Sequence, residues 1–275
     1  MVEAQIDYLL KTYGFDDQRT QAWFSKRGEM LTASEIWKSF ATATASSRIE
    51  LIMSKLVPAK KRDGPGVGAL LWGTRFEPIA KEIYCFEEGV QLKDLSCVPH
   101  PEHSFLGASP DGLILAADHR NGRLVELKCP ISRIFSDKTP VPDEYYHQMQ
   151  LQMECTGLQE CVYLEVKFKR INYSELIDSK AEYKSCFAVS HQTGEVTYRK
   201  FDDTMSVSEW QSKFDPMEVE MWYWFLEHKN QRVIAKDLDW MPMHFPEMKA
   251  TWDEILEHRT NGTFPQPKTK VILEL

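Results

Sequence analysis

The stretch from Gly107 to Lys128, GASPDGLILAADHRNGRLVELK, constrains the fold of this chain more than any other segment. Two short apolar runs flank a polar segment that ends in Asn121-Gly122, a pair typical of tight turns between antiparallel strands. The pattern predicts a β-hairpin. Because side chains alternate between the two faces of a strand, Glu126 and Lys128 share one face of the second strand.

Asp111 lies at the start of the first strand, and a hairpin folded on this turn brings it beside Glu126. Two neighbouring carboxylates repel each other unless a cation lies between them, and Mg²⁺ or Mn²⁺ suits such oxygen ligands. Such an ion can polarise a phosphoryl oxygen and activate water, while Lys128 orients or deprotonates the attacking water. The alternative is a surface hairpin that carries an ordinary Glu/Lys pair.

The composition limits the class of protein. The chain has 275 residues, 43% hydrophobic and 27% charged, which is enough to bury the core of one large domain. No apolar run approaches the roughly 18 residues of a membrane span, and no signal-peptide pattern opens the chain. The 6 cysteines are scattered without a CxxC pair, which favours a reducing intracellular protein that is not secreted. The net charge of −8 argues against an extended basic DNA-binding surface, but not against a local basic channel.

Helices are expected near the N-terminus over residues 3–13, 18–26 and 46–56. Thr32 and Glu35 have the spacing of a capping box, in which each side chain satisfies a backbone N–H at the start of a helix. Ser34 and the nearby Arg27 add a hydroxyl and a guanidinium to that helix N-terminus, a combination that suits a phosphate. The alternative is that Thr32 and Glu35 only cap and that Arg27 is a surface charge.

A long helix is predicted over residues 67–87, after a basic Gly/Pro-rich loop at 58–68 that is either solvated or in contact with DNA phosphates. On this helix Glu77 shares a stripe with apolar and small residues, namely Leu70, Gly73, Ala80 and Tyr84. A bare buried carboxylate is costly. Glu77 therefore needs a metal-bound water or a positive group at the hairpin, or else a salt bridge to a lysine or arginine.

The second half of the chain is expected to extend the sheet and then to become helical. A helix over residues 142–157 carries Gln148, Gln150 and Gln152, whose amides can hydrogen-bond water, phosphate or a carboxylate. Strands are predicted over residues 160–168, 183–190 and 194–201. Helices are predicted over residues 206–229 and 252–258, the first with an aromatic stripe that packs on the sheet, and residues 271–273 are expected to dock or to add an edge strand.

Five short motifs follow one another along the chain: Trp23-x3-Arg27-x4-Thr32-Ala33-Ser34-Glu35, Leu71-Trp72-Gly73-x2-Phe76-Glu77, Gly107-Ala108-Ser109-Pro110-Asp111-Gly112, Leu124-x-Glu126-Leu127-Lys128-Cys129-Pro130 and Tyr146-x-Gln148-x-Gln150. In this order they resemble the lambda-type exonuclease or YqaJ-like viral recombinase family, whose PD-(D/E)xK pattern is Pro110-Asp111 with Glu126-Leu127-Lys128 here. The resemblance covers roughly residues 20–170. It implies an α/β (α+β) fold with a restriction-endonuclease-like core, in which helices flank a central mixed β-sheet. We expect a single nuclease domain over 1–275, with a helical C-terminal extension at about 205–275.

The same resemblance implies roles for individual residues. The ligands of Mg²⁺, for which Mn²⁺ would substitute, would be Asp111, Glu126 and the backbone carbonyl of Leu127. Lys128 would act on the nucleophilic water, and Glu77 would hold that water or a second ion. The terminal 5′-phosphate would be bound by Arg27, Ser34, Ser109 and Gln148, with Gln150 close by in the sequence.

The reaction implied by the resemblance is the degradation of one strand of duplex DNA from its 5′ end. The resulting 3′ single-stranded tail would pass to a single-strand annealing protein for recombination or viral DNA processing, in the host cytoplasm or nucleus and without a membrane partner. Trimers and monomers both occur among such enzymes, so the homo-oligomeric state stays open. One alternative is a structure-specific or alkaline endonuclease of the same fold. Another is a non-catalytic DNA-binding or assembly module, against which the complete Asp/Glu/Lys set argues.

Overall fold

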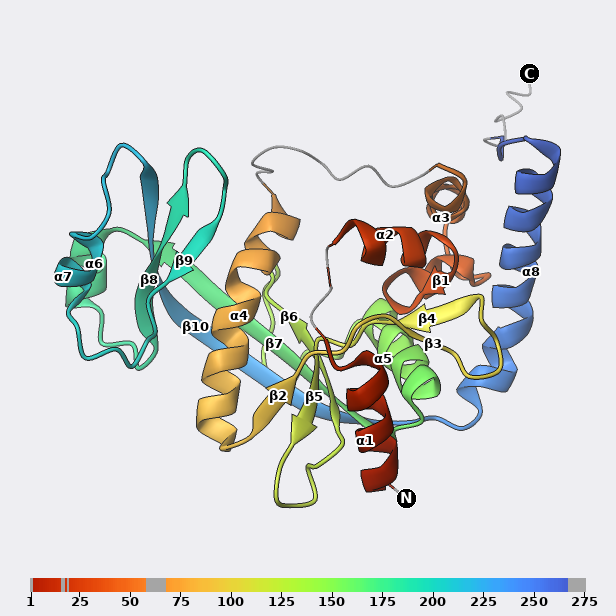
Figure 1. The fold of residues 1–275 in the computed structure, drawn as a ribbon, viewed down its shortest axis with the longest axis horizontal. Coiled ribbons are helices and arrows are strands. Elements are labelled where there is room, and N and C mark those ends of the chain that lie inside the picture. The colour runs from red at the N-terminus through yellow and green to blue at the C-terminus, as the bar shows by residue number, and fades with distance from the viewer. Residues whose placement is uncertain (1, 16–17, 19, 58–67, 267–275) are drawn as a thin grey trace.

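The structure is a computed structural model, and it describes residues 2–15, 18, 20–57 and 68–266. Most of the basic loop at 58–68 and the segment at 271–273 lie outside the described residues. A seven-stranded mixed sheet forms the centre of the molecule (Figure 1). Its strands β6 and β7 run parallel, and the other paired neighbours run antiparallel.

The strands of this sheet are, in spatial order, β2 (Gln91–Lys93), β5 (Gly112–Leu115), β6 (Leu124–Lys128), β7 (Glu160–Ile171), β10 (Val219–Ala235), β8 (Lys184–Ser190) and β9 (Val196–Tyr198). A small second sheet contains β1 (Leu31–Thr32), β4 (Leu106–Ala108) and β3 (Val98–Pro99). The helices are α1 (Val2–Tyr13), α2 (Gln21–Gly28), the 3₁₀ helix η1 (Ala33–Ser39), α3 (Ala45–Leu56), α4 (Ala69–Glu88), α5 (Asp143–Thr156), α6 (Tyr173–Asp178), α7 (Val207–Gln211) and α8 (Trp240–Asn261).

The hairpin predicted from the sequence is confirmed. Strands β5 and β6 pair antiparallel, with Gly112 opposite Val125. Gly122 in the connecting turn has a φ of 87°, a conformation that favours glycine. The hairpin lies inside the sheet, because β2 pairs with the outer edge of β5 and β7 pairs with the outer edge of β6.

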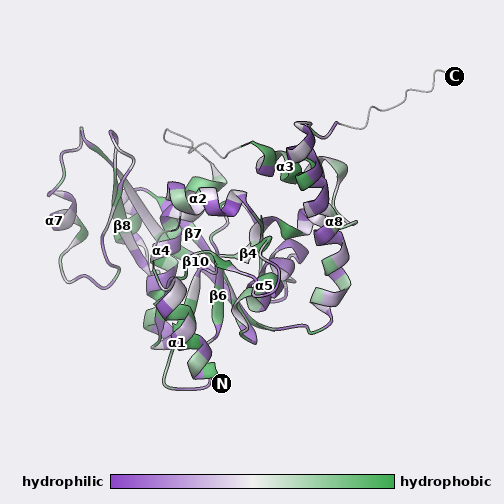
Figure 2. Ribbon diagram, turned by 45° about the vertical axis from the view of Figure 1, so that its right-hand side comes forward, coloured by the Kyte–Doolittle hydropathy of each residue, from purple (hydrophilic) through white to green (hydrophobic). Residues whose placement is uncertain are grey.

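Two helices cover the two faces of the sheet at this hairpin. Val125 and Leu127 point to the face on which α4 packs, where they join a buried cluster with Phe76. Leu124 points to the opposite face and is buried with Met149 of α5. Because Glu126 and Lys128 share the face of Leu124, the structure places both polar side chains beneath α5. In Figure 2, β6 is coloured mainly as hydrophobic, in keeping with a strand covered on both faces.

The helix expected over residues 206–229 is wrong. Within the C-terminal extension expected at about 205–275, α7 and α8 are helical, but β10 is a strand. The short α7 ends at Gln211, and β10 then pairs with β7 on one side and with β8 on the other. Its aromatic residues serve two faces in alternation: Trp222 and Trp224 join the cluster beneath α4, whereas Tyr223 packs on the other face, near α7. Bulky residues that occupy nearly every position fit a helical period as well as a strand period, so pairing in the sheet decided the outcome.

Most other expected elements are present near their predicted bounds. The helices over 3–13, 18–26, 46–56, 67–87 and 142–157 correspond to α1, α2, α3, α4 and α5. The strands over 160–168, 183–190 and 194–201 correspond to β7, β8 and β9, and the short helix over 252–258 is part of the longer α8. Among the described residues, none of the helices combines the length and the apolar character that crossing a membrane requires.

Candidate active site

A cavity of about 500 Å³ opens where β6 ends. Its walls come from α2, η1, α4, the segment before β5, the end of β6 and α5. The predicted site residues that line it are Arg27, Ser34, Glu77, Ser109, Asp111, Glu126, Leu127, Lys128 and Gln148. The fold thus brings together nine of the ten side chains and backbone groups that the sequence singled out, from segments more than 100 residues apart.

Asp111 is held against the edge of β6. Its backbone N–H donates to the carbonyl of Val125, and its Oδ2 accepts a hydrogen bond of 2.8 Å from the N–H of Leu127. The N–H and C=O of one strand residue point to the same edge of the strand. The Leu127 carbonyl is therefore directed to the side on which the Asp111 carboxylate lies, as the predicted ligand set requires.

Glu126 is fully buried, and both of its carboxylate oxygens have partners. Oε2 accepts a hydrogen bond of 2.6 Å from Nε2 of Gln152, and Oε1 forms an ion pair with the ammonium of Lys128. The Lys128 Nζ also donates to Oε1 of Gln148 at 3.3 Å and lies 4.7 Å from the centre of the Tyr145 ring. A carboxylate, an ammonium and two amides thus form one connected network.

The neighbouring carboxylates of the cavity shift the pKa values of the groups around them. Burial raises the pKa of Asp111 well above its ordinary value, and the neighbouring carboxylates of Glu126 and Glu77 raise it further, against the opposing effect of Lys128. Burial lowers the pKa of Lys128, but Glu126 and Asp111 outweigh it, so that the pKa is raised. Lys128 is therefore an ammonium at neutral pH, which can donate hydrogen bonds to water or phosphate but cannot accept a proton.

Glu77 has the salt bridge that the sequence left open as an alternative. Its Oε1 lies 3.1 Å from Nζ of Lys81, which also bonds Asp94 at 2.9 Å. Within the described part of the chain, no three His, Cys, Asp or Glu side chains are grouped closely enough to hold a metal by themselves. Glu77 lines the same cavity as Asp111 and Glu126, and its expected role in holding the nucleophilic water or a second ion stays a prediction.

A second polar group lies on the opposite wall of the cavity. Arg27 donates hydrogen bonds of 2.9 Å to the hydroxyls of Thr32 and Ser34. Its guanidinium stacks over the ring of Trp23, whose Nε1 donates to Oγ of Ser109 at 3.2 Å. Arg27 is thus not an isolated surface charge. The Arg27 guanidinium and the side chains of Ser34 and Ser109 line the cavity, a donor set that suits an anion.

The capping box beside this group is confirmed, although the helix it starts is the 3₁₀ helix η1. Glu35 accepts hydrogen bonds from the backbone N–H and hydroxyl of Thr32 and forms an ion pair with Lys55. Burial acts to raise the pKa of Glu35, but Lys55 and Arg27 bring it below its ordinary value. Sequence reasoning missed Lys55, because its only signal is a position on a helix 20 residues downstream of Glu35.

Two glutamines of α5, Gln150 and Gln152, have different partners, and the sequence alone did not show which of them contacts the site. Gln150, expected near the 5′-phosphate, lies outside the cavity: its Nε2 donates to the carbonyl of Ala235, and its Oε1 accepts from the N–H of Asp237. Gln152 was not among the expected site residues, yet it bonds Glu126. The available signal was helical spacing, since Gln148 and Gln152 are one turn apart and share a face.

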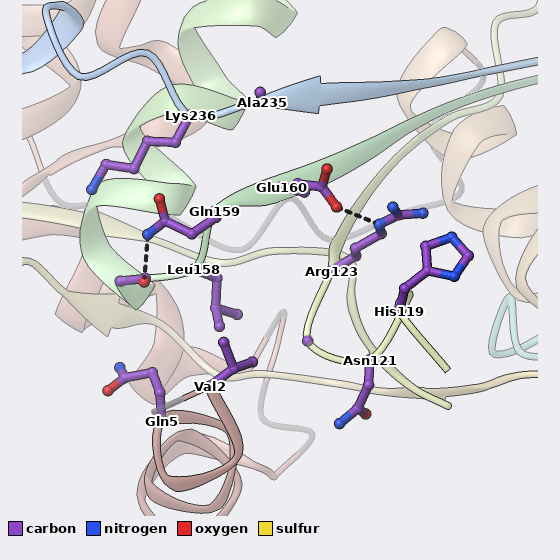
Figure 3. Close-up of a pocket in the computed structure, with 12 residues that line it drawn as sticks. Val2, Gln5, His119, Asn121, Arg123, Leu158, Gln159, Glu160, Ala235 and Lys236 are labelled. Carbon is purple, nitrogen blue, oxygen red and sulfur yellow. Dashed lines mark hydrogen bonds and ion pairs between the residues drawn. The ribbon is translucent and has the colours of Figure 1, made fainter. Parts of the chain in front are cut away.

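A larger cavity, of about 770 Å³, lies at the other end of β6 and β7 (Figure 3). Its charged side chains already have partners: Arg123 forms an ion pair of 2.6 Å with Glu160, and Lys236 forms one of 2.9 Å with Glu154. The amide of Gln5 donates to the carbonyl of Thr156. Despite its size, this cavity contains none of the predicted site residues.

Comparison with known proteins assigns the family. The YqaJ-like viral recombinase domain matches residues 22–159, which is half of the chain and includes both walls of the cavity at the end of β6. The chain belongs to the YqaJ-like viral recombinase family. The resemblance inferred from the five motifs is therefore confirmed.

Solved structures agree with this assignment at the level of the fold. The alkaline exonuclease LHK-Exo from Laribacter hongkongensis is 22% identical, with a TM-score of 0.53 over 88% of this chain and 95% of that one. A structure of LHK-Exo in complex with dAMP gives the same values. The mixed sheet flanked by helices that the sequence predicted is thus the fold of this YqaJ-like protein.

A viral relative shares part of the sequence. The uncharacterized protein R354 of Acanthamoeba polyphaga mimivirus is 28% identical over 176 residues, which is 59% of this chain. The match covers 31% of that protein, so the chain spans about a third of the length of this relative.

Proposed function

We propose that this YqaJ-like protein is a Mg²⁺-dependent deoxyribonuclease that digests linear duplex DNA from its 5′ ends and leaves 3′ single-stranded tails. One observation carries the proposal. The Asp111, Glu126 and Lys128 side chains meet in a single cavity whose opposite wall holds the Arg27 guanidinium. Family membership and the exonuclease-like fold support the same reading.

The residues at the end of β6 fit a divalent cation of the PD-(D/E)xK type. Glu126 is fully buried and Asp111 is partly buried, and the repulsion between their carboxylates contributes to the raised pKa of Asp111, so a positive ion between them would lower the free energy of the ionised pair. With the Leu127 carbonyl they supply the oxygen ligands that Mg²⁺ and Mn²⁺ prefer. Such an ion would polarise the scissile phosphate and lower the pKa of bound water.

The remaining side chains have separate tasks in the same cavity. The Lys128 ammonium donates hydrogen bonds to the attacking water or to a phosphate oxygen and stabilises charge that develops during attack. Gln148 and the Tyr145 ring hold that ammonium in place. In this position Lys128 can orient the attacking water.

The Arg27 pocket gives the enzyme its preference for ends. A terminal phosphate carries more negative charge than an internal phosphodiester, and a guanidinium with hydroxyl donors favours the more highly charged group. Arg27, Ser34 and Ser109 supply these donors on the wall that faces β6. Gln148 lines the same cavity and bonds Lys128, and it would contact the same phosphate.

The test is digestion of a linear duplex labelled at its 5′ or its 3′ ends, with Mg²⁺ or with a chelator. When only one strand carries a 5′-phosphate, we expect metal-dependent release of mononucleotides from that strand and an intact complementary strand. A covalently closed duplex circle is the control, since an exonuclease leaves it intact. Cleavage of the circle at the rate of the linear duplex would identify the alternative, an endonuclease of the same fold.

The proposal extends to partners. The 3′ tails are substrates for a single-strand annealing protein, and co-purification with such a protein on tailed DNA would identify it. A homotrimer would enclose the duplex and favour processive digestion, whereas a monomer would release DNA more often. Light scattering of the purified chain distinguishes the two oligomeric states.

A further inference from the structure

Gln152 is a fully buried side chain that contacts the centre of the proposed active site. Its Nε2 lies 2.6 Å from Oε2 of Glu126, which is itself fully buried. A carboxylate accepts hydrogen bonds and donates none, so the NH₂ end of the amide faces Glu126. The opposite end accepts a weak hydrogen bond from Sγ of Cys161 at 3.8 Å.

We propose that Gln152 is a positioning residue, which holds Glu126 so that one oxygen stays in the protein interior and the other faces the cavity. The proposal rests on the proposed function, because it concerns the orientation of a metal ligand. It concerns geometry alone: Oε2 is taken by the amide, and Oε1 is the oxygen that lies beside Lys128.

The register of helix against strand explains how α5 can do this. Gln148 bonds Lys128 and Gln152 bonds Glu126, so two amides on one helix serve two side chains on one strand. Four residues of a helix span about 6 Å, and two residues of a strand span about 6.7 Å. A helix running antiparallel to β6 can therefore place an amide over each of these two side chains at once.

The helix is fixed at this register by contacts that do not involve the site. Met149, Leu151 and Met153 of α5 are buried in one cluster with Leu124 of β6. The amide of Gln5 in α1 donates to the carbonyl of Thr156 in the last turn of α5. The orientation of Glu126 is thus set by the packing of α5 before any metal binds.

The experiment compares two variants of the full chain, Gln152→Met and Gln150→Met. Methionine is close to glutamine in length and volume and removes the amide. Both glutamines are fully buried, and Gln150→Met also removes a buried amide, with its two hydrogen bonds to the backbone. Calorimetric titration with Mn²⁺ alone measures metal affinity, and thermal melting of each variant measures stability.

We expect Gln152→Met to weaken Mn²⁺ binding by about 10- to 100-fold, the usual effect of removing a group that orients a metal ligand. Gln150→Met should bind Mn²⁺ as the unaltered chain does. If Gln152→Met fails to fold, Gln152→Asn replaces it, since its amide is one methylene too short to reach Glu126.

The possible outcomes distinguish the positioning role of Gln152 from the proposed nuclease function on which it rests. Unchanged Mn²⁺ affinity in Gln152→Met, or an equal loss in both variants, overturns the positioning role and leaves the nuclease proposal standing. Absence of Mn²⁺ binding by the unaltered chain overturns the proposed metal site and the inference together. A selective loss in the Gln152 variant supports both.

Discussion

The two cavities at opposite ends of β6 differ in how their carboxylates are paired more than in size. The larger one pairs each cation with one carboxylate, as in Arg123 with Glu160. The smaller one places Asp111 and Glu126 together, with Lys128 bound to the second of them. A folded chain gains nothing from crowding carboxylates unless a ligand completes the set, so adjacent carboxylates rather than cavity volume indicate the site.

The largest effect is expected from a substitution in the smaller cavity. Asp111→Ala removes one proposed metal ligand and should reduce DNA hydrolysis by about 1000-fold or more. Binding of duplex DNA, measured by mobility shift, should persist in part because the phosphate contacts at Arg27 remain. Arg123→Gln, in the other cavity, is the control and should digest DNA at the rate of the unaltered chain. Full activity in Asp111→Ala would end the assignment.

The next prediction concerns the two walls of the smaller cavity. Arg27→Ala should reduce the preference for 5′-phosphorylated over 5′-hydroxyl duplex ends by about 10- to 100-fold, the loss expected for charge-assisted hydrogen bonds worth about 1.5–3 kcal/mol. The measurement is the ratio of the two initial rates. Equal losses on both kinds of end would show that Arg27 does not recognise the phosphate.

A third prediction concerns how the folding stability of the chain depends on the charge of Asp111. The raised pKa of Asp111 means that the folded state holds its proton to a higher pH than the unfolded chain does, so stability falls as pH rises above the ordinary pKa. Asp111→Asn keeps an acceptor for the Leu127 N–H and removes the charge. Thermal melting with chelator at pH 8 should show a gain of about 1 kcal/mol, which shrinks as pH falls and the wild-type carboxyl is protonated.

No such gain, or one that is independent of pH, would contradict the account of a carboxylate held in an unfavourable site. Added Mn²⁺ should reverse the order, because only the unaltered chain gains the full binding energy of the metal.

The smallest effect is expected in the larger cavity. Glu160→Gln breaks the ion pair with Arg123, in which both side chains are partly exposed. Such pairs contribute about 0.2–1 kcal/mol, so thermal melting should show a small loss and the DNase rate should stay unchanged. A large loss of activity here would mean that the two ends of β6 are coupled and that the comparison is mistaken.

Much of the site could be predicted from local sequence patterns. The Asn121-Gly122 turn and the alternation along β6 were enough to predict the hairpin and to place Glu126 with Lys128. The spacing of Thr32 and Glu35 was enough to predict the capping box. These features depend on backbone geometry over a few residues, which is the same wherever the segment lies in the molecule.

The other features of the fold and of the site depended on contacts between distant parts of the chain. The aromatic residues of β10 fit both a helix and a strand, and the edge of β7 decided between them. Gln150 and Gln152 are two residues apart on α5, yet one bonds the backbone beyond β10 and the other bonds Glu126.

The sequence by itself determined which residues are candidates for the chemistry and the order in which they follow along the hairpin. Only the tertiary structure decided which groups complete them, namely the amides of α5 and the stack of Arg27 on Trp23. The physical reason is that short-range periodicity sets the direction of a side chain, whereas its partner is set by how helices and strands pack.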